Sequence, residues 1–219
     1  MDWAKLASNA LWVMRALASM ILAAALGACE TTRLTEPAQT ATEQLVITTA
    51  IDNAVEMLNE TLKPSLPSNT KVYVDTTYLD TTPADDLLFT KYEIGAVRDQ
   101  LLRNGARLVT DKKDADDIVE LRTGGQSIDH NTFLVGIPSF PLPIPFTTAS
   151  FPEIALYKRD RRTGVAKLAA TVYSESTGVL AGSSGPQYGS SDHTHFSLLF
   201  VVSWVDTNIE PEDLRPRTE

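Results

Sequence analysis

Two histidines near the C-terminal end have the spacing of a metal site. In Asp192–His195 (DHTH) the imidazoles are two residues apart, and in a strand two such side chains lie on one face. Two imidazoles on one face can bind zinc, with His130 or Asp129 as a third ligand. The same run also fits a polar loop before an apolar segment. We predict no resident metal and keep His193 and His195 as the weak candidates.

Serines and carboxylates are the other groups that could do chemistry. Gly182–Ser191 contains four serines, but no Gly-x-Ser-x-Gly elbow surrounds them, and its composition favours a flexible loop. Asp75 and Asp80 flank a short segment after a β-rich run, where a pair of carboxylates could act as acid and base. Turn and cap roles explain these two aspartates more simply. The chain has no phosphate-binding glycine loop and no dinucleotide fingerprint, so no cofactor is predicted.

Cys29, the only cysteine, has the most specific chemistry in the chain. It follows Gly27-Ala28 at the end of the uncharged apolar run Ala16–Leu26, which a mildly basic segment precedes. This run is shorter than the ~20 residues that span a membrane. Small residues before a cysteine resemble a bacterial lipobox. We expect cleavage between Ala28 and Cys29 and a covalent lipid on Cys29. The alternative is a buried helix with an incidental cysteine.

The likeness to bacterial lipoproteins also implies a location. Several acyl chains anchor a protein stably, whereas one does not. Asp directly after the cysteine would favour retention in the inner membrane, and Glu30 is a weaker signal of the same kind. We therefore expect the outer membrane, facing the periplasm, with the inner membrane as the alternative. The net charge of −9 disfavours nucleic acid and a polybasic grip on anionic lipid. The predicted membrane contact is therefore the lipid on Cys29.

The rest of the chain is predicted to form one domain. We expect a signal peptide at 1–28, a tether at 29–39, a single domain at 40–209 and a polar tail at 210–219. Thr40 and Glu43 have capping-box spacing at the start of a helix that Pro64 ends. A second capping box, Thr90 with Glu93, predicts another helix.

The second helix is expected to end at Asn104-Gly105. Short β-rich runs predict strands, and turn residues separate the last three of them. The fold class is therefore α/β (α+β), a single domain with a mixed sheet, at least two helices and a C-terminal antiparallel meander. The expected strands are Val72–Val74, Arg107–Val109, Ile118–Leu121, Glu153–Lys158, Val165–Ser174 and Val179–Ala181, with turns at Asp160–Gly164 and Ser176–Gly178. The nearly apolar run Phe196–Trp204 predicts a buried strand or short helix.

Gly124–Ser150 is the unusual segment, because prolines alternate with large apolar residues in its second half. Proline removes backbone donors, so an extended loop outside the sheet is predicted. Its apolar side chains need cover from their own domain, a neighbour or lipid. The candidate contact surface consists of Phe133, Ile137, Phe140, Leu142, Ile144 and Phe146.

Four runs resemble a family of bacterial lipoproteins of unknown function, and the match covers nearly the whole mature chain. They are Thr31–Ala54, Val74–Asp80, Tyr92–Leu108 and Gly136–Ser139. Leu101–Gly105, Ala115-Asp116 and Thr177-Gly178 are similar, at the level of fold, to the superfamily of the curli-secretion and penicillin-binding-protein-activator lipoproteins. The resemblance implies export and an α/β layer, and it implies no activity.

These observations predict a non-enzymatic, membrane-anchored lipoprotein of the cell envelope. Its partner is another envelope component or a second copy of the chain. The alternatives are a periplasmic metal-dependent or serine hydrolase that uses Asp192–His195, and a carrier of a small apolar ligand.

Overall fold

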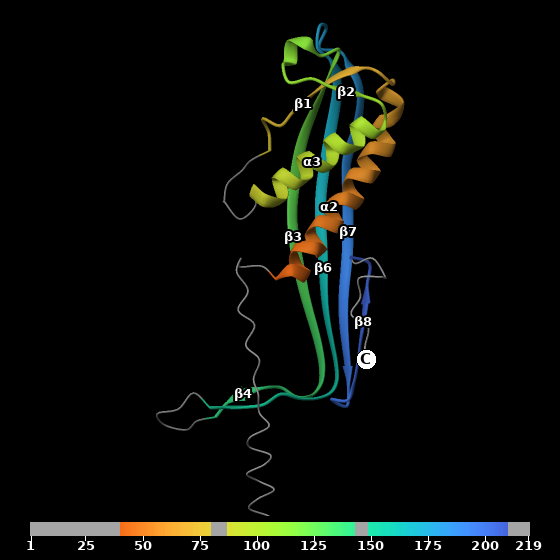
Figure 1. The fold of residues 1–219 in the computed structure, drawn as a ribbon. Coiled ribbons are helices and arrows are strands. Elements are labelled where there is room, and N and C mark those ends of the chain that lie inside the picture. Colours follow the sequence, from red (N-terminus) through yellow and green to blue (C-terminus); the bar gives the residue numbers. More distant parts are fainter. Residues whose placement is uncertain (1–39, 80–86, 143–148, 210–219) are drawn as a thin grey trace, which may run out of the picture. The chain divides into compact units, whose positions relative to one another are not determined.

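The computed structural model describes residues 40–79, 87–142 and 149–209. These residues all belong to the unit Gln39–Glu219. The predicted signal peptide, tether and tail, with Ala28 and Cys29, lie outside the described residues. The elements, labelled as in Figure 1, are α2 (Ala41–Leu62), η1 (Lys63–Ser65), β1 (Lys71–Asp75), α3 (Leu87–Arg103), β2 (Arg107–Leu108), η2 (Lys112–Asp114), β3 (Asp117–Ile137), β4 (Phe140–Pro141), β5 (Ser150–Phe151), β6 (Ile154–Ser174), β7 (Leu180–Leu198) and β8 (Val202–Thr207).

Six strands form one mixed sheet in the order β2-β1-β3-β6-β7-β8 (Figure 1). β1 pairs in parallel with β2 and β3, and the remaining neighbours are antiparallel. β4 and β5 form a second, two-stranded sheet. The mixed sheet, the two helices and the antiparallel run β6-β7-β8 confirm the predicted fold class.

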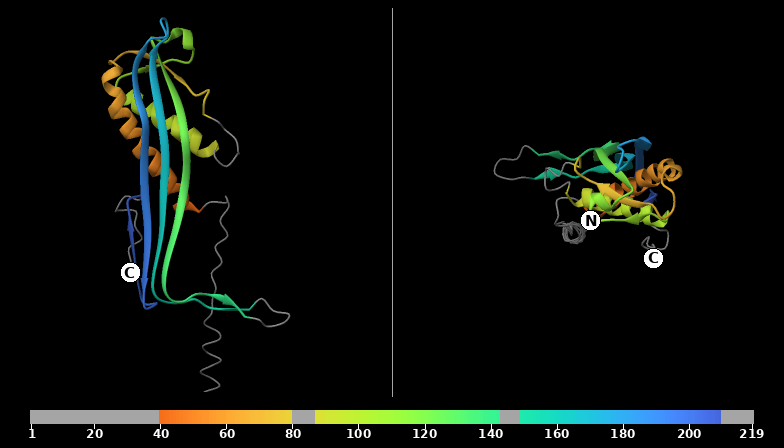
Figure 2. Two further views of the ribbon diagram at one scale, coloured as in Figure 1. Left: turned by 180° about the vertical axis from the view of Figure 1, so that it is seen from behind. Right: turned by 90° about the horizontal axis from the view of Figure 1, so that it is seen from above.

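α2 begins where its sequence predicts. The Thr40 hydroxyl accepts from the Glu43 N–H at 3.2 Å, and Glu43 Oε2 accepts from the Thr40 N–H at 2.8 Å. This reciprocal capping box satisfies two of the free donors at the helix start. Pro64, in η1, follows the last α-helical turn. The buried face of α2 is apolar and packs on β6 and β7 (Figure 2).

Glycines in β6 and β7 let α2 approach the sheet closely. A Cβ on Gly189 would collide with the Ala50 carbonyl oxygen and the Ala54 nitrogen of the helix backbone, and one on Gly164 would lie 2.6 Å from Val46 Cγ1. The predicted turn at Asp160–Gly164 is wrong, because these residues lie inside the 21-residue strand β6. The predicted flexible loop at Gly182–Ser191 is also wrong, because these residues form β7.

The predicted capping box of the second helix is wrong. Thr90 lies inside α3, which already includes Leu87. Glu93 is turned toward the sheet, where its Oε2 accepts from Gln126 Nε2 of β3 at 2.5 Å. The expected stop is confirmed, since Gly105 has a φ of +87° and donates to the Leu102 carbonyl oxygen at 2.9 Å.

Two predictions for the apolar segments are also wrong. Phe196–Trp204 is neither one buried strand nor a helix, because β7 ends at Leu198 and β8 begins at Val202. Gly124–Ile137 is not a loop, because it continues β3 alongside β6. The prediction of a segment outside the main sheet holds only from Pro138 onward, where β4 pairs with β5 instead.

Candidate interaction surface

The long strands continue beyond the helices at one end of the sheet (Figures 1 and 2). His130 marks this boundary, because its Nε2 lies 3.2 Å from Glu43 Oε1 in the first turn of α2. Arg162, His193 and Thr207 are in register with His130 across β6, β7 and β8. We call the part beyond this row, residues 131–137, 154–161, 194–198 and 202–206, the distal sheet.

The side of each residue follows from strand alternation in β6. Ala166, Leu168 and Ala170 face the helices and belong to the core. Tyr157 and Arg159 are an odd number of residues away from these three along β6, so their side chains lie on the other side of the sheet. Their cross-strand partners share that side. The rows are Val135–Tyr157–Leu198–Val202, nearest the end, and then Phe133–Arg159–Phe196–Trp204.

We call the seven residues of these rows other than Arg159 the apolar face. Two ring contacts organise it: Phe133 meets Tyr157 edge to face, with centroids 6.1 Å apart, and Phe196 stacks on Trp204 at 5.0 Å. These side chains remain accessible, with Phe133 50% exposed and Val202 53% exposed. Exposed apolar patches of this kind mark interaction sites more often than isolated apolar residues do.

The helix-side face of the distal sheet has a different character. It is built mainly of polar and charged side chains, among which Lys158 forms an ion pair with Glu153 at 2.8 Å. The distal sheet is therefore amphipathic across its thickness. The residues on this face are Thr132, Leu134, Lys158, Asp160, His195, Ser197, Ser203 and Val205.

The turn between β7 and β8 extends the apolar character to the end of the sheet. Leu199 and Phe200 both have positive φ, 49° and 61°, a conformation that hairpins normally give to Gly or Asn. Leu199, Phe200 and Val201 are all exposed, Val201 by 85%. Such strain without burial is typical of functional segments. The Leu199 N–H donates to the Leu156 carbonyl oxygen at 2.9 Å, which ties the turn to β6.

One arginine interrupts the apolar face. Arg159 lies between Phe133 and Phe196, and its buried Nε has no hydrogen-bond partner among the described residues. The next arginine along β6, Arg161, is instead paired with Asp192 at 2.8 Å. Arg159 is therefore the one charged residue within the two rows that form the apolar face.

The structure places four of the six predicted contact residues. Phe133 and Ile137 are in β3, Phe140 is in β4, and Leu142 follows it. Phe140 stacks on Phe151 at 5.0 Å and stays 45% exposed. Ile144 and Phe146 lie outside the described residues.

Sequence reasoning missed the partners of Phe133, because they come from later strands. The available signal was the alternation Phe196, Leu198 and Val202, Trp204 on either side of the turn.

The histidine and serine candidates have mostly structural surroundings. His193 and His195 lie on one side of β7, as expected for a strand, and His193 Nδ1 is 3.2 Å from the Thr207 hydroxyl. Within the described residues no three His, Cys, Asp or Glu side chains gather as a metal cluster. Ser184 accepts from the Ala170 N–H at 2.9 Å, and the buried Ser191 hydroxyl donates to the Val46 carbonyl oxygen.

Of the two carboxylate candidates, Asp75 also has structural surroundings. The Thr77 hydroxyl donates to Asp75 at 2.6 Å, and this bond is the main cause that holds the Asp75 pKa below its usual value. Lys112 adds an ion pair at 3.5 Å. Asp80, the other carboxylate of the predicted pair, lies outside the described residues.

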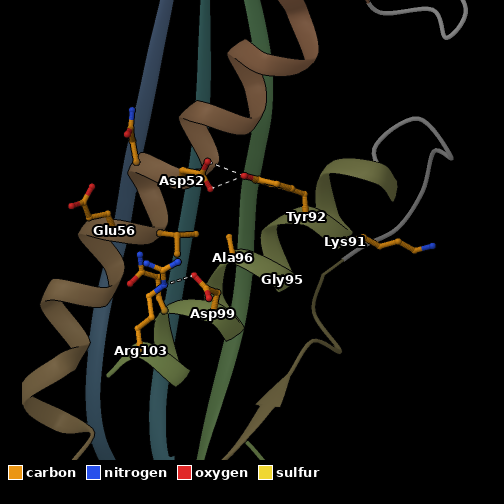
Figure 3. Close-up of a pocket in the computed structure, with 11 residues that line it drawn as sticks. Asp52, Glu56, Lys91, Tyr92, Gly95, Ala96, Asp99 and Arg103 are labelled. Atoms are coloured by element: carbon orange, nitrogen blue, oxygen red, sulfur yellow. Dashed lines mark hydrogen bonds and ion pairs between the residues drawn. The ribbon is translucent and has the colours of Figure 1, made fainter. Parts of the chain in front are cut away.

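A polar groove of about 700 Å³ runs between α2 and α3 (Figure 3). The Tyr92 hydroxyl donates to Asp52 at 2.9 Å, and Arg103 pairs with Asp99 at 2.7 Å. Burial, and then the Asp52 contact, raises the pKa of Tyr92 to about 12. Tyr92 therefore stays protonated and acts as a donor that joins the two helices. The described residues that line the groove include no Ser, Thr, Cys or His, so the groove offers polar contacts rather than a usual nucleophile with its base.

The sequence profile of a family of unknown function (DUF6655) matches residues 23–202. The chain belongs to this family. No curated protein matches it. None of the described helices has the length and apolar character to cross a membrane.

Proposed function

We propose that this protein is a lipoprotein of the cell envelope that binds another envelope component, or a second copy of itself, through the distal sheet. It has no catalytic activity in this proposal. A lipid on Cys29 holds it to the outer membrane, facing the periplasm. The observation that carries the proposal is the apolar face together with the exposed turn at Leu199–Val201.

The energetic argument concerns the accessible area. The apolar face and the turn place ten large apolar or aromatic side chains at one end of the sheet, and most of them are exposed. Full burial of an exposed side chain of this kind gains roughly 1.5–3 kcal/mol, and each of these side chains would gain the part that corresponds to its exposed fraction. A structure that keeps this area open, with two non-glycine residues at positive φ, is better explained by a partner than by folding alone.

The anchoring part rests on the N-terminal sequence. The apolar run that ends at Gly27-Ala28-Cys29 supports export and lipidation. The resemblance of the mature chain to a family of bacterial lipoproteins of unknown function supports the same location.

The surroundings of the reactive groups favour binding over catalysis. Asp192 accepts from Arg161 at 3.0 Å and from the Thr163 hydroxyl at 2.7 Å. The Ser184 and Ser191 hydroxyls are used in bonds to the backbone. A nucleophilic mechanism needs a serine, a base and an orienting group within mutual reach.

Cell fractionation tests the anchor. The parent should label with palmitate and sediment with outer membranes, whereas Cys29→Ala should not label. A Cys29→Ala chain that still labels with palmitate, as the parent does, would refute the lipid assignment.

Cross-linking in intact cells, both to proteins and to photoactivatable lipids, tests the binding surface. The paired variant Leu198→Ser/Val202→Ser removes apolar area from the apolar face, and Leu134→Ser/Val205→Ser removes the same residue types from the opposite face. We expect cross-linked species to disappear only with the first pair. Equal loss from both pairs, or loss from neither, would overturn the proposed surface.

A further inference from the structure

The apolar face has a polarity gradient along the strands. The row nearest the end is aliphatic apart from Tyr157, and the next row contains Phe133, Phe196, Trp204 and Arg159. The third row on the same face is polar. It consists of Asn131, Arg161, Thr194 and Asp206.

This order matches the layers of a phospholipid surface. Rows on one face of a strand are about 7 Å apart, and interfacial segments reach about 5–10 Å into the boundary of headgroups and acyl chains. Aliphatic residues would then lie deepest, Trp204 would lie at headgroup level, and Asp206 would remain in water. Aromatic residues favour that intermediate level because they have an apolar body and a polar edge.

Arg159 supplies the charge complementarity. It lies in the aromatic row, and its buried Nε has no hydrogen-bond partner among the described residues. Its aliphatic part can remain with the apolar face while the guanidinium reaches a phosphate, which it can bind through two parallel hydrogen bonds. A second copy stacked symmetrically on this face would instead bring two Arg159 side chains toward each other.

The sheet edges decide the orientation. Beyond Glu120 of β3, and along the outer side of β8, no strand pairs with the backbone among the described residues. Unpaired backbone groups do not occur within the hydrocarbon layer. The distal sheet would therefore rest tilted on the surface rather than cross the membrane. The end with the turn Leu199–Val201 would lie deepest, and the polar side, with Asp160 and His195, would face water.

We infer that the apolar face docks on a phospholipid surface, with Trp204 and Arg159 at headgroup level and the turn Leu199–Val201 reaching the acyl chains. This inference rests on the proposed function, since it names the envelope component. It adds a second membrane contact that does not depend on the lipid on Cys29.

Segment 39–219 isolates this contact from the N-terminal apolar run. The whole core cluster lies between Ile47 and Val172, so the segment retains it. Trp3 and Trp12 are absent from the segment, which leaves Trp204 as its only tryptophan. Trp204 fluorescence therefore reports on the apolar face directly.

The assay mixes segment 39–219 with vesicles of phosphatidylethanolamine and phosphatidylglycerol. We expect flotation with the vesicles, a blue shift of Trp204 emission, and quenching by lipids brominated on the acyl chain. Leu198→Ser/Val202→Ser should weaken binding at least about tenfold. The matched control, Leu134→Ser/Val205→Ser, should bind like the parent. Arg159→Gln should weaken binding severalfold.

Four results would overturn the inference. They are a parent segment that does not float, no quenching of Trp204 in the unmutated segment, equal losses in the two paired variants, and Arg159→Gln that binds like the parent. The quenching result stands even if a variant fails to fold. If the segment does not bind vesicles but dimerises through Leu198 and Val202, the inference of a phospholipid surface is wrong, and the proposed function still holds. Loss of the cross-linked species with both paired variants would instead count against the proposed function.

Discussion

Gly189→Ala tests how closely α2 lies against the sheet. The new Cβ would collide with the Ala50 carbonyl oxygen and the Ala54 nitrogen. Both atoms belong to the helix backbone, so no side-chain rotation can relieve the contact, and α2 must move away from β7. Overpacking of this kind costs about 1–3 kcal/mol. We expect the upper end, about 3 kcal/mol, because a displaced α2 also loses contacts with the core.

Thermal unfolding of segment 39–219, followed by circular dichroism, measures this cost. For a domain of this size each kcal/mol shifts Tm by roughly 2–4 °C, so Gly189→Ala should lower Tm by roughly 6–12 °C. Gly95→Ala is the control, since nothing lies within 4 Å of its added Cβ in the middle of α3. Alanine is a better helix former than glycine by about 1 kcal/mol, so this variant should melt higher than the parent. A Gly189→Ala segment that melts like the parent would refute the close packing and restore a flexible loop at Gly182–Ser191.

Three further predictions concern titration, the proline-spaced segment and metal. Burial raises the pKa of Glu93 to about 7, above its ordinary 4.5, so the folded state binds this proton more tightly than the unfolded state. The resulting stabilisation, about 3 kcal/mol, is complete below about pH 4.5 and is lost as pH rises through 7, and Glu93→Gln should remove this slope in urea titrations. Phe140→Ser/Leu142→Ser should leave Tm of the segment nearly unchanged, since Phe140 contacts Phe151 outside the core cluster. The same variant should lower the oligomeric mass of the segment, measured by light scattering. Metal analysis of the purified segment should find no stoichiometric zinc, and His193→Ala/His195→Ala should leave the metal content unchanged.

Each of these predictions has a result that contradicts it. Parallel stability profiles of parent and Glu93→Gln would mean that Glu93 does not bind its proton more tightly on folding. A large fall in Tm of Phe140→Ser/Leu142→Ser with unchanged association would make this segment ordinary core. Zinc that is present in the parent and lost with the histidines would favour the alternative of a metal-dependent hydrolase.

Local sequence patterns determined the parts of the fold whose interactions are short in range. The capping box of Thr40 and Glu43 and the stop at Gly105 are both made within a few residues. The same rule failed at Thr90, because Glu93 finds its partner, Gln126, on a different element. A capping pattern is decisive only when no distant residue competes for its side chains.

The functional residues also differ in whether local sequence is enough to recognise them. The spacing that predicts lipidation of Cys29 is readable from the sequence alone. The apolar face was not readable, since Phe133, Tyr157, Phe196 and Trp204 come from four strands that only the sheet register brings together.

Glycine shows most clearly what only the tertiary structure decided. By local rules, the glycines of Asp160–Gly164 and Gly182–Ser191 predict a turn and a flexible loop. In the fold, Gly164 and Gly189 lie inside strands, because the helix α2 occupies the space that a side chain would need. The sequence by itself shows the positions of the glycines. The packing of α2 against the sheet decides that Gly164 and Gly189 serve close approach and not a turn. A missing side chain can serve either backbone freedom or close approach, and only the position of the distant helix distinguishes the two.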